Sequence, residues 1–397
     1  MSSVAVRLTP GFLLMLSALT ALTPLGTDIY LSAVPAIASD YGNSLHEVEL
    51  SVSVFLMGFS LGQLLGGPLS DRYGRRRMVL IGLSIFAVGS LGIILAPSLD
   101  VMLAFRVVQA LGGGLAVVNS TAIIRDLASG REGAGAMIRV IQVMMIAPLV
   151  APLLGMLILK MLGWHSVFGF LLIYALLLIV LFYFRLPETR KVRTGGNPLR
   201  NYWQVLSDRR IWGFVASTCA AYAGMLSFVT SSPGIFMGHF GLSDTVYPLV
   251  FGCVVLTMLA MSKVNLHLLK RYSPPVLISI GQKIQIAMGM LMVGYIFLFD
   301  ELSVWPLTLM LMLYIGSHGF VVANATSSIT EYFPHLAGTA TALVGALGFA
   351  SGGIAGGVVS ALSDGSPKAM VCMMLAAVLF GSIIRRLTKS FQELASA

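Results

Sequence analysis

Long apolar runs, each broken by only a few polar positions, recur along the whole chain. A helix needs about 20 predominantly apolar residues to cross the ~30 Å hydrocarbon core of a bilayer. Twelve runs meet this requirement, so the pattern predicts an all-α membrane protein with twelve spans. Their predicted limits are 11–38, 48–69, 78–96, 101–124, 137–160, 165–186, 211–237, 245–268, 275–299, 303–328, 336–362 and 367–387.

The longest polar interruption divides these spans six and six. We therefore expect an N-terminal six-helix bundle at 1–186, a cytoplasmic linker at 187–210 and a C-terminal six-helix bundle at 211–397. Within the linker, a Gly-Gly-Asn-Pro turn cluster at 195–198 precedes residues 199–206, which could form a short helix on the membrane surface.

Two short matches at one shared offset suggest that the halves are an internal repeat. Arg72-Tyr73 corresponds to Arg271-Tyr272, and Ile81-Gly82 corresponds to Ile280-Gly281. A repeat of this kind is typical of transporters built by duplication.

Lys and Arg gather in the loops on one side of the predicted spans, whereas the opposite loops hold acids such as Asp40, Glu49 and Asp364. The positive-inside rule therefore predicts that both termini are cytoplasmic. The composition is 57% hydrophobic and 10% charged, against about 25% charged residues in soluble domains. The net charge of +9 follows from the loops and gives no continuous basic face, so nucleic acid is not an expected partner.

Asp28 is the only acid that the pattern places deep inside an apolar run. A carboxylate there costs roughly 2.5 to 3.5 kcal/mol on insertion scales, so a function is expected to offset this cost. Its approximate counterpart in the second half is Ser227 or Phe228, so the repeat does not preserve the acid. We interpret Asp28 as a proton carrier; the alternative is a structural ion pair with Arg106.

The loop at 67–77 combines glycines, an acid and a basic cluster in a fixed order. Positive-inside anchoring explains the arginines but neither Asp71 nor the glycines. This loop resembles the signature loop of the major facilitator superfamily. The resemblance implies that the acid caps the N-terminus of span eleven in the outward-open state and that Arg75 pairs with Asp126 at the end of span four. It assigns a cytoplasmic gate to Gly67, Asp71, Arg72, Gly74, Arg75 and Asp126.

Residues 103–114 resemble the span-four pattern of the same superfamily and contain Arg106 and Gln109. Arg106 could simply extend to the headgroups. The resemblance instead favours an inward-facing cation that tunes proton binding at Asp28.

Span five contains Pro148 and Pro152 in a segment that resembles the antiporter motif of this superfamily. The motif's glycines are replaced by Ala147, Ala151 and Met156, although small residues still recur at 147, 151 and 155. Prolines kink the helix and small residues allow close helix approach. A purely structural kink is the alternative to an exporter geometry.

Several segments are typical of the drug/proton antiporter branch with twelve spans, and resemble its bicyclomycin and chloramphenicol resistance subfamily. They are 28–35, 164–168, 186–189 and 333–357. The resemblance implies a proton-coupled exporter of small amphipathic, drug-like compounds in the bacterial inner membrane, working as a monomer. An importer or a metabolite exporter, for example of amino acids, is the alternative within this fold.

Polar and aromatic side chains within the spans are candidates for substrate binding, although small polar residues can instead hydrogen-bond between helices. The candidates are Tyr30, Gln109, Asn119, Tyr222, Ser227, Phe228, Ser231, His318 and Asn324. Lys283, deep in span nine, is expected to extend to the headgroups or to line the cytoplasmic cavity.

Enzymatic and ATP-driven functions lack the residues that they need. The spans hold no His-rich or paired-carboxylate constellation, and the chain has no Gly-x-x-x-x-Gly-Lys loop. We therefore expect no metal and no cofactor. Cys219, Cys253 and Cys372 follow no metal or disulfide spacing and are expected to be free and buried.

Overall fold

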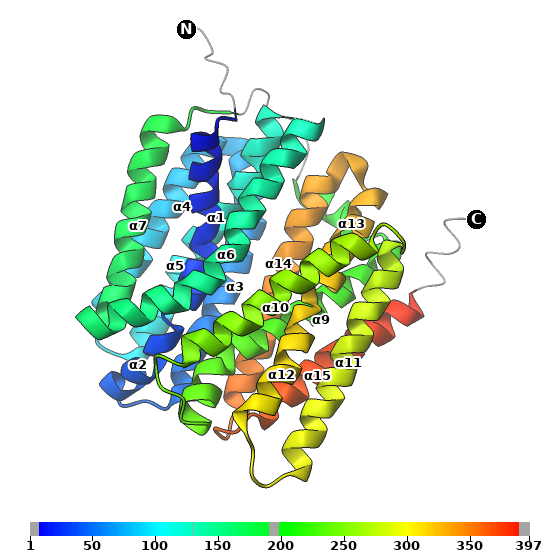
Figure 1. Ribbon diagram of the computed structural model, residues 1–397. Helices are drawn as coiled ribbons and strands as arrows, with labels where there is room; N and C mark the ends of the chain where they lie inside the picture. The colour runs from blue at the N-terminus through cyan, green and yellow to red at the C-terminus, as the bar shows by residue number, and fades with distance from the viewer. Residues whose placement is uncertain (1–7, 129, 190–197, 389–397) are drawn as a thin grey trace. The chain divides into compact units, whose positions relative to one another are not determined.

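The computed structural model describes residues 8–128, 130–189 and 198–388. Within these ranges the regular structure is helical and contains no strand (Figure 1). In the described part of the chain, twelve helical segments are long and apolar enough to cross a membrane, and each matches one predicted span to within a few residues. The prediction of an all-α, twelve-span fold is confirmed.

Contacts between residues divide the chain into two compact units. The first unit comprises Met1–Leu31 and Met57–Gly196, and the second comprises Ser32–Leu56 and Asn197–Ala397. Residues 32–56 thus pack with the C-terminal helices, although they precede the linker in the chain. The division into bundles at 187–210 stays a prediction.

The first unit is built from long helices that meet backbone to backbone. A Cβ at Gly62 would overlap the Leu111 carbonyl oxygen, and one at Gly112 would overlap the Phe86 backbone nitrogen. Glycine therefore allows the helix at 99–127 to pack closely against the helices at 45–73 and 75–94. The helices are α1 (Pro10–Asp28), α3 (Leu45–Tyr73), which continues into the second unit, α4 (Arg75–Ile94), α5 (Leu99–Leu127), α6 (Gly130–Leu162) and α7 (Trp164–Arg185).

In the second unit, α9 packs against α13, α14 and α15. The short surface helix predicted at 199–206 is present as α8, whereas most of the turn cluster before it lies outside the described residues. The elements are η1 (Leu31–Ala33), α2 (Val34–Tyr41), α8 (Pro198–Leu206), η2 (Arg209–Ile211), α9 (Trp212–Pro233), η3 (Gly234–His239), α10 (Tyr247–Leu268), α11 (Pro274–Leu298), α12 (Val304–Gly316), α13 (His318–Tyr332), η4 (Pro334–Leu336), α14 (Ala337–Ala361) and α15 (Lys368–Leu387).

Among the described residues, three spans are interrupted within the bilayer-crossing stretch. In the first span, the α-helix ends at Asp28 and the span continues through η1 and α2. The seventh span changes to a π turn after Pro233. The tenth span is divided between α12 and α13 at Ser317. Interrupted spans expose backbone polar groups at membrane depth, which is where transporters place their binding sites. These breaks are therefore the places in the fold where site residues are expected to gather.

The free cysteines correct one expectation. Cys219 is half-buried, but Cys253 and Cys372 are exposed. Side chains that face lipid count as exposed when the protein is considered without a bilayer, and Phe184 and Leu298 are further examples of exposed apolar side chains. Apolar sequence context therefore does not distinguish the interior of the protein from its lipid-facing surface.

Candidate functional site

Asp28 is the last residue of α1, at the interruption of the first span. Its side chain is buried, with only 6% of the residue exposed, and it forms no ion pair among the described residues. The prediction of a buried acid is confirmed, whereas the alternative of a structural ion pair with Arg106 is not supported.

Arg106 is fully buried and points toward the same interruption. Both of its terminal nitrogens donate to the Gly26 carbonyl oxygen at 3.1 Å, and Nη1 also donates to Gln109 Oε1 at 2.6 Å. Gly26 lies in the last turn of α1, where carbonyls lack helical partners and carry partial negative charge. The cation thus stabilises the helix end that carries Asp28. Extension of Arg106 to the headgroups is ruled out by its burial.

Two aromatic rings complete the surroundings of Arg106. Its guanidinium carbon lies 4.4 Å from the centre of the Tyr30 ring and 5.7 Å from that of Phe168. A desolvated cation over an aromatic face gains about 2 kcal/mol. Gln109 in turn donates to Ser90 Oγ at 2.8 Å, so the network spans α1, α4, α5 and α7. Tyr30 and Gln109, which were predicted to bind substrate, thus contact Arg106 of the proton-site candidate.

The proline-containing helix also meets the interruption. α6 continues without a break through Pro148 and Pro152. At Gly155, a Cβ would overlap the Ile29 carbonyl oxygen. The small-residue spacing of this segment thus lets α6 contact the backbone immediately after Asp28.

Asn119 is buried elsewhere in α5. Its amide nitrogen donates to the Leu115 carbonyl at 2.7 Å within its own helix, and its Oδ1 has no hydrogen-bond partner among the described residues. No described contact joins it to the Arg106 network.

In the second unit, Tyr222 and His318 form the centre of an aromatic cluster. Their rings pack edge to face with centroids 5.1 Å apart, and Phe349 lies 5.3 Å from Tyr222. His318 is the first residue of α13, directly after the interruption of span ten, and its Nδ1 lies 3.3 Å from the Ala221 carbonyl oxygen. The cluster joins α9, α13 and α14.

Three other candidates have structural partners. Ser227 donates to the Ala223 carbonyl at 2.7 Å, and Phe228 stacks on Phe251 with centroids 5.6 Å apart. Asn324 donates to Asn265 Oδ1 at 2.9 Å and so joins α13 to α10. These contacts correspond to the helix-packing alternative that the sequence left open.

Glu49 is a second buried acid, which the sequence pattern places in an outer loop. Only 2% of the residue is exposed, and its Oε1 accepts a hydrogen bond of 2.7 Å from the Gly234 N–H at the π turn of span seven. It lines a cavity of about 490 Å³ together with His46, Ser231 and Asp364. Ser231 Oγ has no hydrogen-bond partner within the described ranges, so it is available to a ligand there.

Asp364 is another acid among the residues that line this cavity. Hydrogen bonds from the Ser366 hydroxyl and N–H, at 2.5 and 2.9 Å, hold the pKa of Asp364 below its usual range. The acid therefore stays ionised near neutral pH.

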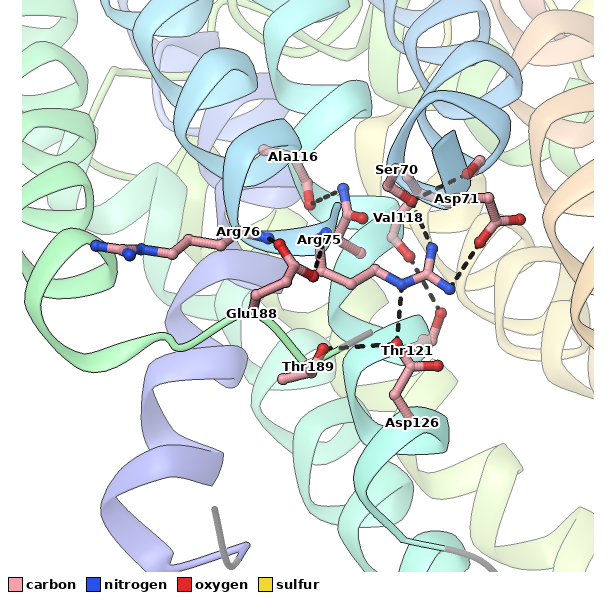
Figure 2. Close-up of polar contacts among 12 residues, drawn as sticks. Ser70, Asp71, Arg75, Arg76, Ala116, Val118, Thr121, Asp126, Glu188 and Thr189 are labelled. Carbon is pink, nitrogen blue, oxygen red and sulfur yellow. Dashed lines mark hydrogen bonds and ion pairs between the residues drawn. The ribbon is translucent and has the colours of Figure 1, made fainter. Parts of the chain in front are cut away.

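Figure 2 shows how Arg75 joins the loop at 67–77 to the end of α5. Its Nε donates to Asp126 Oδ2 at 2.9 Å, its Nη2 pairs with Asp71 Oδ1 at 2.8 Å and its Nη1 donates to Ser70 Oγ at 2.5 Å. The predicted pair of Arg75 and Asp126 is present. We call Ser70, Asp71, Arg75, Asp126 and Glu188 the Arg75 cluster.

Glu188, like Ser70, is a member of this cluster that was not among the predicted gate residues. Its carboxylate accepts the backbone N–H groups of Arg75 at 2.9 Å and Arg76 at 3.3 Å, and so caps the N-terminus of α4. Gly74 has a φ of 102°, and a Cβ there would overlap Glu188 Oε2. Glycine is required at 74 for both reasons. Gly67 accepts a hydrogen bond from Ser70, and Arg72 stacks over Tyr73.

Residues 16–357 match the sequence profile described as Major Facilitator Superfamily. The chain belongs to the Major Facilitator Superfamily. With twelve membrane-spanning helices and bacterial relatives in this superfamily, it is a multi-pass transporter of the inner membrane and not an enzyme.

Named relatives in the superfamily cover almost the whole chain. A bicyclomycin resistance protein homolog of Haemophilus influenzae is 30% identical over 374 residues, 93% of each chain. A chloramphenicol resistance protein of Pseudomonas aeruginosa is 30% identical over 378 residues, 93% of this chain and 88% of that one.

Solved structures show the same fold. A peptide transporter matches with a TM-score of 0.75 at 13% identity, covering 97% of this chain and 96% of that one. A D-xylose-proton symporter matches with a TM-score of 0.72 at 18% identity, covering 94% and 97%.

The Arg75 cluster gives a prediction for this member of the superfamily. Asp126→Asn removes the better buried partner of Arg75 and should lower the free energy of unfolding by about 1.5–3 kcal/mol, the usual range for charged hydrogen bonds. Asp71→Asn removes a half-exposed partner and should cost less than about 1 kcal/mol. Thermal unfolding of the purified variants measures both, and a larger loss in Asp71→Asn would contradict the geometry.

Proposed function

We propose that the protein is a proton-coupled exporter of small amphipathic compounds that works by alternating access. The observation that carries this proposal is Asp28, a buried carboxyl at an interruption of the first span, without an ion-pair partner among the described residues. Burial favours the neutral acid and water favours the carboxylate, so such a group binds and releases a proton as its access to water changes.

The names of the relatives support a drug-like substrate, because resistance to bicyclomycin or chloramphenicol is obtained when a transporter removes the compound. In the proposed cycle, Asp28 takes a proton from the outer side in exchange for substrate. It releases that proton toward the cytoplasm. Arg106 holds the end of α1 in place during both steps.

The proposal includes the side of the membrane and the gate. Both termini are assigned to the cytoplasm by the distribution of Lys and Arg, so the Arg75 cluster would act as a cytoplasmic latch. Breaking the contacts of Arg75 with Asp126 and Asp71 would accompany opening toward the cytoplasm. Asp71 would cap span eleven in the outward-open state, as the superfamily resemblance implies. The working unit is proposed to be a monomer.

Transport by reconstituted protein tests the direction of coupling. With an acidic lumen, an antiporter accumulates substrate as protons leave, whereas a symporter requires an acidic exterior. We expect labelled chloramphenicol or bicyclomycin to accumulate only with the acidic lumen, and a protonophore to abolish the accumulation.

The same experiment separates the alternatives. Accumulation driven by an acidic exterior would indicate an importer. Accumulation of an amino acid such as cysteine, without either drug, would indicate a metabolite exporter. Drug transport that is independent of both gradients would refute proton coupling.

A further inference from the structure

A second polar cavity, of about 390 Å³, lies between α11 and α15 in the second unit. Gln282 and Lys283 of α11 line it, together with Ser382, Arg385 and Arg386 of α15. It contains Lys283, the lysine deep in span nine that was expected to extend to the headgroups or to line the cytoplasmic cavity. None of these residues belongs to the proposed proton site or to the Arg75 cluster.

Arg385 is held rigidly at this cavity by neutral groups alone. Its Nε donates to Gln282 Oε1 at 2.9 Å, its Nη2 to Ser279 Oγ at 2.7 Å and its Nη1 to the Pro275 carbonyl at 3.3 Å. Gln282 is itself fixed by a 3.1 Å hydrogen bond to Ser217 of α9. The guanidinium is thus oriented in advance, and none of its described partners compensates its charge, as anion sites require.

The other polar side chains of the cavity have hydrogen-bond donors that no described residue accepts from. Lys283 and Arg386 form no hydrogen bond or ion pair with any described residue, and none of the described residues that line the cavity is an acid. Ser382 is 93% buried, its residue being 7% exposed, and its Oγ has no partner in the described part of the chain. The N-terminus of α11, which is the positive end of its helix dipole, also borders the cavity, because Pro275 in the first turn of α11 is a lining residue.

Apolar surface continues the cavity into the span. Ile286 is a lining residue, and Met290 lies one turn further along α11 with 56% of its surface exposed. Leu379 lies one turn before Ser382 on α15 and is 39% exposed. A basic recess beside an exposed apolar strip matches an anion that carries a hydrocarbon chain, whereas a free anion would leave the strip unused.

We propose that this cavity binds the phosphate-bearing headgroup of an anionic phospholipid such as phosphatidylglycerol, with one acyl chain along Ile286, Met290 and Leu379. Arg385 would orient the phosphate, Lys283 and Arg386 would supply charge, and Ser382 would donate a hydrogen bond. Basic recesses between transmembrane helices recognise anionic headgroups in this way.

Native mass spectrometry of the full-length protein in detergent, titrated with dioleoylphosphatidylglycerol, tests the proposal. The variant K283Q/R386Q removes two cations that form no hydrogen bond or ion pair with a described residue, so the fold should persist. We expect its affinity for the lipid to fall about 30-fold. The control R139Q/R185Q removes the same charge from exposed positions of α6 and α7 and should bind as the wild type does.

Ser382→Ala provides an independent variant, because its hydroxyl has no described partner to lose within the protein. We expect binding several-fold weaker than that of the wild type and an unchanged thermal unfolding temperature. Equal binding by all variants, or equal binding of dioleoylphosphatidylcholine, would overturn the proposal. Displacement of the lipid by millimolar inorganic phosphate or glycerol phosphate would show a free-anion site and would also overturn it.

Discussion

Replacing Asp28 by asparagine is expected to abolish accumulation of substrate against a gradient, down to the level of protein-free liposomes. Asparagine has almost the same shape but cannot exchange a proton, and Asp28 has no ion pair with a described residue whose loss would disturb the fold. The protein should therefore express and unfold as the wild type does. Exchange of labelled for unlabelled substrate without a pH gradient should persist, because this partial reaction moves no net proton.

Glu49→Gln provides the matched control, since Glu49 is the other acid that the described residues bury, and the sequence placed it outside the proton site. Glutamine keeps the oxygen that accepts the Gly234 N–H, so the link between α3 and the π turn should remain. We expect pH-driven accumulation to persist in this variant. A substrate gradient built by Asp28→Asn, or its selective loss in Glu49→Gln, would move the proton site away from Asp28.

The spans were predictable because a bilayer imposes a length and a polarity on every crossing helix. The interruptions within them were not. Beside the break after Asp28, the Gly26 carbonyl accepts hydrogen bonds from Arg106, which lies 80 positions from Gly26 in the chain. Pro24 alone gives no sign of the break, because α1 continues through that residue.

The buried acids also show that local sequence pattern predicts burial only in part. Asp28 was recognised since apolar residues surround it in the sequence itself. Glu49 lies near the start of its span beside His46 and Glu47, so it resembles a loop residue, and its burial comes from the Gly234 contact 185 positions away. Glu188 follows a helix end and a proline, and only the folded chain brings it to the start of α4.

The candidate substrate-binding residues fall into two groups, which differ in the contacts that neighbouring residues make with them. Tyr30 and Gln109 lie beside Arg106, and Tyr222 packs on His318. Asn324, by contrast, satisfies its amide through Asn265, whose partner role no spacing rule predicts. Residue type identifies a polar group within a span, but only packing shows whether a protein group already satisfies it.

Gly155→Ala is expected to produce the second large effect. Its new Cβ would overlap the Ile29 carbonyl oxygen, a backbone atom that no rotamer change can move away. The backbone at Ile29 and α6 must therefore move apart, and overpacking of this kind costs about 1–3 kcal/mol or more. The displaced segment directly follows Asp28, so transport should fall at least tenfold together with the thermal unfolding temperature.

Gly135→Ala isolates this contact from the general effect of alanine in a helix. Gly135 lies on the same helix, a Cβ at this position would have no atom within 4 Å, and alanine there should stabilise the helix by about 0.5–1 kcal/mol. The two variants should consequently shift the unfolding temperature in opposite directions. Equal unfolding temperatures and equal transport rates in the two variants would contradict this prediction. The close approach of α6 to the backbone after Asp28 would then have no role in transport, and Pro148 and Pro152 would remain as the functional feature of the antiporter-like segment.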